Sequence, residues 1–257
     1  MRISDPLHTL YVRRLRRQVA AGRLPEHVGL VMDGNRRWAR RKGMSNPSVG
    51  HQYGAEHVED LLAWCDTLAI RHVTVFVCST ENLRRRDAAE VAFLMHTIER
   101  VVATHLTRPA AEWRVHVAGA LDILPARTAH ALTQAVAATR DRTGAHVTLA
   151  VGYGGRQEVV DAIRELLYER AGAGHSVEDI AAGLTADDIT RHLYTAGQPE
   201  PDLVIRTSGE QRMSNFLLWQ SAYSELYFCE PYWPAFREVD FLRALRSYAG
   251  RLRRYGA

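Results

Sequence analysis

Short apolar runs alternate with longer segments of helical periodicity along most of the chain. The runs are rich in β-branched residues and predict strands at Val28–Met32, His72–Cys78, Arg114–Ala118, Val147–Val151, Leu203–Ile205 and Leu226–Cys229. Apolar residues at helical spacing predict helices at Tyr53–Leu68, Ala88–Leu106, Ala126–Arg140, Arg156–Ala171, Ala186–Leu193 and Val239–Tyr255. Because strands separated by helices of this length form parallel sheets, we expect a single α/β domain with a mostly parallel central sheet of about six strands flanked by helices.

A basic amphipathic helix is predicted at Leu7–Ala21, before the first strand. Leu10, Leu15 and Val19 share one face of this helix, and arginines such as Arg13 make the rest of its surface basic. A helix of this kind either docks on the domain by its apolar face or lies on anionic lipid. We expect it to dock.

Composition and charge narrow the class of protein. With 257 residues, 46% of them hydrophobic, the chain can bury a large core, and only Lys42 among its 33 basic residues is a lysine. A net charge of +4 suits a polyanionic small substrate or an acidic membrane surface and is too weak to indicate nucleic acid. Cys65, Cys78 and Cys229 lack metal-ligand spacing. We therefore expect a reduced cytosolic protein without zinc, and no apolar run is long enough to span a bilayer.

Asp33 directly follows the first predicted strand, and Gly34 and Asn35 separate it from a cluster of arginines. Ligands of open α/β sheets bind beyond the carboxyl ends of such strands. A carboxylate and arginines at a helix N-terminus are what a site for Mg²⁺ and a diphosphate needs. Taken alone, the junction could equally be a helix cap, because Asp and Asn are favoured there.

Further candidate groups follow other strands. Ser79–Asn82 offers small hydroxyl and amide groups that can hold a diphosphate or relay a proton, or that simply cap a turn. The loop after the fifth strand carries Arg206, Arg212 and Ser214, which can grip a diphosphate or form a solvated basic loop. Glu225 lies in a very apolar run and therefore needs a cation or an arginine as its partner.

Together these stretches resemble the cis-prenyltransferase family, the undecaprenyl diphosphate synthase-like enzymes. The motifs stand in the family's order and cover almost the whole chain from His27 to Gly256, so the combination is highly specific. In detail they resemble those of actinobacterial short-chain (2Z,6E)-farnesyl diphosphate synthases. The matching motifs are MDGNRRWA at Met32–Ala39, GHQYG at Gly50–Gly54, STEN at Ser79–Asn82, GYGGR at Gly152–Arg156, DLVIRTSGEQRMSNF at Asp202–Phe216 and LLWQSAYSELYF at Leu217–Phe228.

The resemblance implies a role for each matching residue. Asp33 would bind Mg²⁺ on the allylic diphosphate, with Glu225 contributing to the metal across a homodimer interface. The residues matching the allylic diphosphate site are Gly34, Asn35, Arg36, Arg37 and Trp38. Those matching the isopentenyl diphosphate site are Arg206, Arg212 and Ser214. Diphosphate positioning or proton removal falls to His51, Ser79 and Asn82, and closure of a mobile loop to Glu81 and Arg85.

The chain departs from the long-chain pattern at several positions. Arg36 stands where many members have Gly, Leu83 replaces a usual Trp, and Gly152 stands where Asn is common. The arginine expected shortly before the GHQYG motif is missing, and Arg40 or Arg41 is the candidate to replace it.

Product length is expected to depend on a hydrophobic tunnel for the growing chain. Val77 occupies a strand position that is often Ala in long-chain members, and a bulkier side chain there would stop elongation early because packed interiors have little slack. The apolar stripe of Ala88–Leu106 is either ordinary core or a wall of that tunnel.

We expect an N-terminal basic amphipathic helix in residues 1–26, from its pattern, and the resemblance implies a cis-prenyltransferase catalytic domain in residues 27–257. Our leading hypothesis is a cytoplasmic homodimer that condenses isopentenyl diphosphate with geranyl diphosphate, giving (2Z,6E)-farnesyl diphosphate, with peripheral membrane contact as an option. A long-chain undecaprenyl or decaprenyl diphosphate synthase is the alternative. A non-catalytic partner subunit would lack Asp33 or the set Arg206, Arg212 and Ser214, and all four are present.

Overall fold

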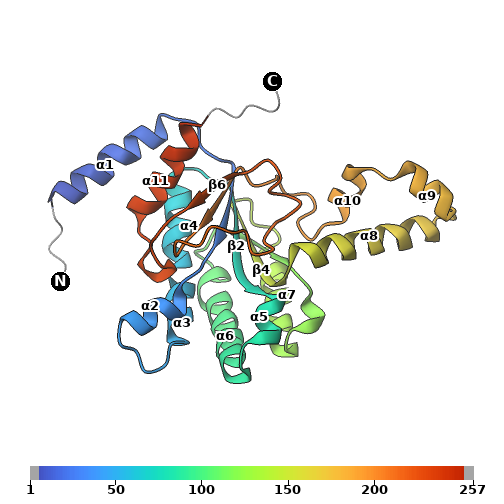
Figure 1. The fold of residues 1–257 in the computed structure, drawn as a ribbon, viewed down its shortest axis with the longest axis horizontal. Coiled ribbons are helices and arrows are strands. Elements are labelled where there is room, and N and C mark those ends of the chain that lie inside the picture. The colour runs from blue at the N-terminus through green and yellow to red at the C-terminus, as the bar shows by residue number, and fades with distance from the viewer. Residues whose placement is uncertain (1–5, 252–257) are drawn as a thin grey trace.

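The computed structural model describes residues 6–251, with side chains from residue 9 onward. Within this range one six-stranded sheet has the order β3-β4-β2-β1-β5-β6, and every neighbouring pair is parallel (Figure 1). The strands are β1 (His27–Val31), β2 (His72–Ser79), β3 (Arg114–Ala118), β4 (His146–Tyr153), β5 (Leu203–Arg206) and β6 (Glu225–Phe228). The predicted α/β class and parallel sheet are confirmed.

Helices connect these strands, and α8, α9 and α10 project from the sheet as an arm (Figure 1). The helices are α1 (Pro6–Ala20), α2 (Asn35–Arg41), α3 (Val49–Glu56), α4 (Val58–Thr67), α5 (Thr80–Arg85), α6 (Ala88–Val101), α7 (Ala126–Ala138), α8 (Gly155–Gly172), α9 (Val177–Gly183), α10 (Ala186–His192) and α11 (Glu238–Ala249). Shorter turns are the π-helical η1 (Val102–Leu106) and the 3-10 turns η2 (Leu121–Ile123) and η3 (Trp233–Ala235).

Some helix boundaries differ from the predicted ones. The segment predicted as one helix from Tyr53 to Leu68 is two helices, α3 and α4, which join at His57, whose Nε2–H donates to the carbonyl of Phe236 over 2.6 Å. Apolar periodicity continues through this junction and hides it. The last helix ends at Ala249, and the predicted positions 252–255 lie outside the described residues. The extents of α2, α5 and α9 were not predicted, because these helices are only six or seven residues long, too short to show a period.

The hydrophobic core lies mainly on one face of the sheet. Strand residues such as Leu30 and Val75 belong to the larger cluster, which α4, α6, α7 and α11 complete. The predicted stripe of α6 packs into it, with Leu94 and Ile98 both buried. Alternate strand positions such as Val31 form a smaller cluster on the other face with residues of the loop after β5.

The N-terminal helix docks as expected. Leu15 and Val19 are buried in the larger core cluster, and α1 packs against α11. Arg16 forms an ion pair with Glu238 of α11. Leu7, with which the predicted helix begins, has its side chain outside the described side chains. No helix within residues 6–251 is long and apolar enough to cross a membrane.

Candidate active site

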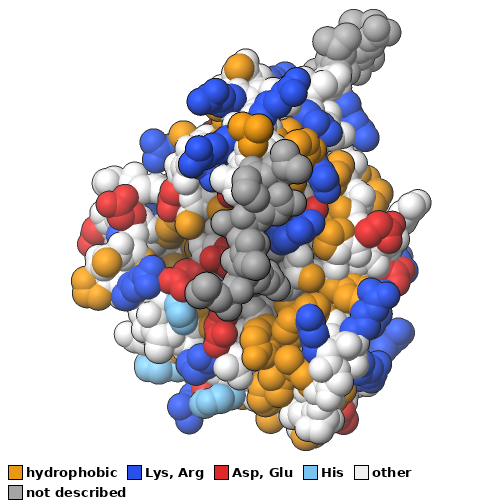
Figure 2. All heavy atoms as spheres, turned by 90° about the vertical axis from the view of Figure 1, so that its left-hand side faces the viewer, with side chains coloured by type: hydrophobic (Ala, Val, Ile, Leu, Met, Phe, Trp, Pro, Cys, Tyr) orange, Lys and Arg blue, Asp and Glu red, His pale blue; other side chains and the backbone are white. Residues whose placement is uncertain are grey.

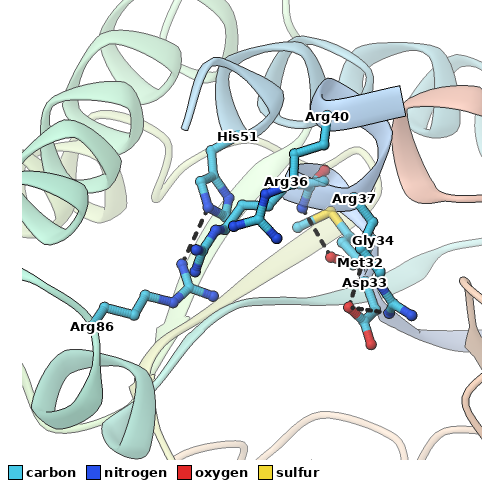
Figure 3. Close-up of a pocket in the computed structure, with 9 residues that line it drawn as sticks. Met32, Asp33, Gly34, Arg36, Arg37, Arg40, His51 and Arg86 are labelled. Carbon is cyan, nitrogen blue, oxygen red and sulfur yellow. Dashed lines mark hydrogen bonds and ion pairs between the residues drawn. The ribbon is translucent and has the colours of Figure 1, made fainter. Parts of the chain in front are cut away.

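Two adjoining cavities lie at the carboxyl edge of the sheet, where the parallel strands end. The first has a volume of about 310 Å³ and is lined by Met32, Asp33, Gly34, Asn35, Arg36, Arg37, Arg40, His51 and Arg86 (Figure 3). The second has a volume of about 280 Å³ and is lined by Val31, Met32, Asp33, Asn35, His51, Phe76, Val77, Cys78, Ser79, Asn82, Arg86, Arg206, Arg212 and Ser214. We call them the first and the second cavity. Both are lined by Asp33.

Asp33 is held by groups from three segments of the chain. Its carboxylate accepts hydrogen bonds from Arg206 Nη2 over 2.7 Å, from Arg37 Nη2 over 3.2 Å and from the Gly34 N–H over 2.6 Å. Its own N–H donates to Thr207 Oγ1 over 2.9 Å. Partial burial raises the pKa of Asp33, but the hydrogen bond and charge of Arg206, then Arg37 and Gly34, outweigh burial and lower that pKa overall. The carboxylate is therefore ionised at neutral pH.

Gly34 makes the turn from β1 into α2. Its φ is +94°, and a Cβ added there would lie 2.6 Å from a carbon of the Tyr232 ring, so only glycine fits this close approach. The guanidinium carbons of Arg37 and Arg41 lie 5.4 and 5.6 Å from the centroid of the same ring, in cation–π contact. Tyr232 therefore packs against the start of α2 and its arginines, a role that its sequence position did not indicate.

The loop after β5 is strained and carries the second set of predicted residues. Arg206 is buried, and its Nη1 donates to Ser214 Oγ over 2.6 Å and to the carbonyl of Arg212 over 2.5 Å. Left-handed backbone occurs at Ser208 (φ 81°) and Ser214 (φ 52°), a conformation that costs energy outside glycine. The Arg212 side chain is largely exposed and pairs with Glu210. The loop thus aims one buried and one exposed guanidinium at the second cavity.

Asn215 connects this loop to two other motifs. Its φ is 65°, and its side chain donates to Glu81 Oε1 over 3.0 Å and accepts from the N–H of Arg156 over 2.9 Å. Sequence reasoning did not single it out, although Asn is among the few residues that adopt left-handed backbone readily. Ser79 caps α5 by accepting from the Asn82 N–H over 3.0 Å, and both line the second cavity.

A buried carboxylate, Glu90, lies behind the first cavity. Its oxygens are 2.9 Å from Arg36 Nη1, 3.1 Å from Arg86 Nη1 and 3.3 Å from His51 Nε2. Burial, and after it the charge of Arg86, lowers the pKa of His51 to about 4. His51 is therefore neutral at neutral pH, and its Nε2 accepts from Arg86 Nη1 over 3.2 Å. The only sequence signal for Glu90 was its position three residues after Asp87, whose carboxylate caps α6 by accepting from the Glu90 N–H.

The structure also separates predicted residues that the motifs place together. Arg40 lines the first cavity, whereas Arg41 and Trp38 line a different groove on the other side of α2. Arg85 lines neither the first nor the second cavity. Of the two arginines considered as replacements for the missing one, Arg40 lines the first cavity and Arg41 does not.

Glu225 lies far from these cavities within the chain. It begins β6, in register with Leu203 at the start of β5, whereas Asp33 follows the end of β1. Its carboxylate pairs with Arg251 over 2.5 Å. The expected arginine partner is present, and Glu225 could meet a metal at Asp33 only from a second chain.

Val77 is the extra residue of a bulge in β2. Phe76 pairs with Ala150 and Cys78 with Val151, so Val77 has no partner on β4. Val77 and Cys78 both pack against the larger core cluster, whereas Phe76 packs against the smaller one. Bulges are common beside active sites, where they change the direction in which side chains point. Phe76, Val77 and Cys78 therefore line the second cavity in succession, and the predicted tunnel beyond them stays a prediction.

The donor set suits a divalent ion that is shared with a substrate. Within residues 6–251 no group of three or more His, Cys, Asp or Glu side chains could hold a metal alone. Mg²⁺ usually retains water and is bound by one or two carboxylates together with substrate phosphates. Asp33, ionised and partly accessible in both cavities, fits that requirement.

Fold and site together define a class, an α/β protein with two adjoining arginine-lined cavities at the carboxyl edge of a parallel sheet. The chain belongs to the undecaprenyl diphosphate synthase family of prenyltransferases, because the model of that family matches residues 31–256. The family expected from the motifs is confirmed.

Relatives extend over the whole chain. An isoprenyl transferase of Streptomyces fradiae is 73% identical, with 100% of both chains covered. A (2Z,6E)-farnesyl diphosphate synthase of Thermobifida fusca is 53% identical, with 98% of this chain and 97% of that protein covered. The crystal structure of lavandulyl diphosphate synthase from Lavandula x intermedia, in complex with dimethylallyl diphosphate, matches with a TM-score of 0.84 at 32% identity, covering 91% of this chain and 99% of that one.

Proposed function

We propose that this prenyltransferase condenses isopentenyl diphosphate with geranyl diphosphate to give (2Z,6E)-farnesyl diphosphate. The observation that carries the proposal is the pair of adjoining arginine-lined cavities that share Asp33. Two diphosphates bound side by side, with one carboxylate between their sites, are what head-to-tail condensation of two prenyl diphosphates requires. The name of the Thermobifida relative supports the short product.

Each cavity is assigned one diphosphate. The first cavity, with Arg36, Arg37 and Arg40 from α2 and Arg86 opposite, takes the allylic diphosphate, because guanidinium groups make charge-assisted hydrogen bonds to phosphate oxygens. The second cavity takes isopentenyl diphosphate, and the residues assigned to it are Arg206, Arg212 and Ser214.

Mg²⁺ is assigned to Asp33 together with the allylic diphosphate. A bound Mg²⁺ neutralises charge that develops on the leaving diphosphate. The carboxylate of Asp33 offers hard oxygen ligands, and Arg206 and Arg37 keep it ionised and oriented. Glu225 joins this site only if a partner subunit supplies it.

The reaction needs little from the protein besides binding and orientation. The C–O bond of the allylic diphosphate breaks, and the diphosphate leaves with the electron pair. The isopentenyl double bond then attacks the carbocation, and loss of one proton fixes the new cis double bond. His51, Ser79 and Asn82 line the second cavity and can position the diphosphate or the departing proton. With its pKa near 4, His51 is a weak base, so we favour positioning for it.

The test is turnover of labelled isopentenyl diphosphate with dimethylallyl, geranyl and farnesyl diphosphates as separate primers, with Mg²⁺ and with a chelator. The proposal predicts incorporation that depends on Mg²⁺ and is fastest with geranyl diphosphate. A non-catalytic partner subunit would incorporate no label with any primer. A long-chain synthase would prefer farnesyl diphosphate and release products of many units.

We infer that the protein is a homodimer that uses the projecting arm. Val160 and Leu167 lie one heptad apart on α8 and are 47% and 42% exposed, and Tyr168 beside them is 75% exposed. An apolar stripe on a projecting helix is covered in most soluble proteins. Sedimentation should show a dimer for the wild type and a monomer for Val160→Asp combined with Leu167→Asp.

We also propose that the protein works in the cytoplasm and touches the membrane through α1. Leu10 is 65% exposed on this helix, and Arg13, Arg14 and Arg17 are exposed around it. Figure 2 shows basic and hydrophobic side chains mixed over the upper part of the molecular face that it displays. Flotation with anionic vesicles should recover the wild type more efficiently than Arg13→Ala combined with Arg14→Ala.

A further inference from the structure

Glu90 is contacted by two arginines and one neutral histidine from three different parts of the chain. Arg36 belongs to α2, His51 to α3, and Arg86 follows the end of α5. The Glu90 side chain is 4% exposed, whereas Arg36 and Arg86 are 39% and 20% exposed and line the first cavity. Glu90 itself does not line that cavity. A buried carboxylate thus lies behind two guanidinium groups that face the cavity.

The position of Glu90 is fixed independently of the cavity. It is the third residue of α6, its N–H donates to Asp87 Oδ1 over 2.8 Å, and a carboxylate in the first turn of a helix is stabilised by the helix dipole. Arg36 and Arg86, in contrast, are long side chains with many rotamers, which lose entropy when they are ordered. An anchored carboxylate that orders both of them lowers the entropic cost of binding a phosphate group between them.

We propose that Glu90 is a positioning residue for the allylic diphosphate and that it holds the Arg36 and Arg86 side chains in place as ligands of that group. The proposal rests on the proposed function, because it assumes that a prenyl diphosphate binds in the first cavity. Figure 3 shows Arg36, Arg40 and Arg86 converging with His51 in this cavity, while Arg37 turns towards Asp33. Glu90 does not touch the substrate and acts through the two arginines.

Charge and positioning predict opposite effects of removing the Glu90 carboxylate. If Glu90 were only a negative charge near the cavity, Glu90→Gln would make the cavity more positive and would tighten diphosphate binding. If Glu90 positions the arginines, Glu90→Gln frees both guanidinium groups and weakens binding. The sign of the change therefore separates the two roles.

The experiment measures calorimetric dissociation constants for geranyl diphosphate, inorganic pyrophosphate and isopentenyl diphosphate. For Glu90→Gln we expect geranyl diphosphate and pyrophosphate to bind about tenfold more weakly, as for a lost charge-assisted contact, with isopentenyl diphosphate changed less than about twofold. The KM for geranyl diphosphate should rise with kcat nearly unchanged. Glu90→Asp should recover part of the loss.

Two further sets of variants keep the test independent of folding. Arg36→Gln and Arg86→Gln remove the proposed ligands directly, and Glu90→Gln added to that pair should cause no further loss. Glu99→Gln is the matched control, because Glu99 lies on the same helix and pairs with Arg127 over 2.9 Å outside both cavities. It should leave all three dissociation constants unchanged.

The outcomes distinguish this inference from the proposed function. A wild-type protein that binds no prenyl diphosphate overturns the proposed function and the inference with it. If the wild type binds both substrates but Glu90→Gln binds geranyl diphosphate as tightly as before, or more tightly, only the inference is overturned. The inference alone also fails if Glu90→Gln weakens the binding of both substrates equally. It fails likewise if the folded Arg36→Gln and Arg86→Gln variants bind geranyl diphosphate as tightly as the wild type.

Discussion

Arg206 donates a 2.7 Å hydrogen bond from Nη2 to Oδ2 of Asp33, and this pair links the two cavities. The same guanidinium binds Ser214 and the carbonyl of Arg212 through Nη1, so the end of β1 and the loop after β5 are joined by one buried side chain. The residue assigned to Mg²⁺ and a residue assigned to isopentenyl diphosphate are thus direct partners. Substitutions at Asp33 or Arg206 should therefore change the binding of both substrates.

Asp33→Ala should abolish turnover. Without the carboxylate, Mg²⁺ is not held on the leaving diphosphate, and a loss of several kcal/mol of charge stabilisation means a rate lower by about a thousandfold or more. Arg206 also loses its partner, so the melting temperature should fall although the protein still folds. Steady-state rates and thermal melts check this. A variant that kept a tenth of wild-type activity would contradict the metal role of Asp33.

Arg206→Ala and Arg212→Ala should differ, although the motif treats them alike. The Arg212 side chain is largely exposed and is linked to the first cavity indirectly, through Glu210, which also pairs with Arg37. Its loss should therefore weaken the binding of isopentenyl diphosphate, by roughly 1.5–3 kcal/mol, much more than that of the allylic substrate. Arg206→Ala should weaken the binding of both substrates and lower the stability of the protein, because Arg206 orients Asp33. Dissociation constants for each substrate decide this. If both variants changed the two dissociation constants in the same ratio, the Arg206–Asp33 pair would have no role in binding the allylic diphosphate.

Val77→Ala should lengthen the product. The bulge places Val77 and Cys78 together on the wall of the second cavity, so removing two methyl groups opens space where the growing chain would extend. Combining it with Leu94→Ala, which opens the packed face of α6, should lengthen the product further. The first condensation should continue at a similar rate. Chromatography of dephosphorylated products would refute this role of Val77 if both variants still stopped at farnesol.

The sequence was sufficient to locate the strands, because most are apolar runs, whereas β3 alternates Arg114 and His116 with valines. Strand order and the π-helical end of α6 depend on tertiary packing, which periodicity does not report. The break at His57 was invisible for the same reason. Short helices such as α5 show too few residues for a period to emerge.

Residues that line the two cavities were predictable where a motif places them at or just after the end of a strand, as for Asp33, Ser79 and Arg206. Glu90 and Tyr232 could not be predicted, because their contacts join segments far apart in the sequence and depend on how α2 packs. The Val77 bulge was also hidden, since an extra residue in one strand is defined only by its partner strand.

A row of histidines crosses the opposite end of the sheet. His27, His72 and His146 are the first residues of β1, β2 and β4 and stand in register. His116 of β3 joins them through a 2.9 Å contact between its Nε2 and His146 Nδ1. Burial lowers the pKa of His27 to about 4. The Pro199 carbonyl, which accepts a hydrogen bond from the His27 ring, acts in the opposite direction but is outweighed. Burial, then the charge of His146, lowers the pKa of His116 to about 4.

This row predicts a loss of stability in mild acid. Between about pH 6.5 and pH 4 the unfolded chain binds protons at these histidines and the folded protein does not, so stability is complete above that window and falls within it. His27 alone accounts for roughly 3 kcal/mol over the window. Urea unfolding of wild type and His27→Asn should show a shallower pH dependence in the variant. Equal slopes would contradict the contribution of His27.

The most direct test of the proposed function is the product made from geranyl diphosphate and isopentenyl diphosphate by the wild-type enzyme. After dephosphorylation, chromatography against standards of defined geometry measures both chain length and the new double bond. We predict (2Z,6E)-farnesol as the main product. Decaprenol-length or longer products would replace the short-chain assignment with the long-chain one, and all-trans farnesol or a branched lavandulyl-type alcohol would contradict cis head-to-tail condensation.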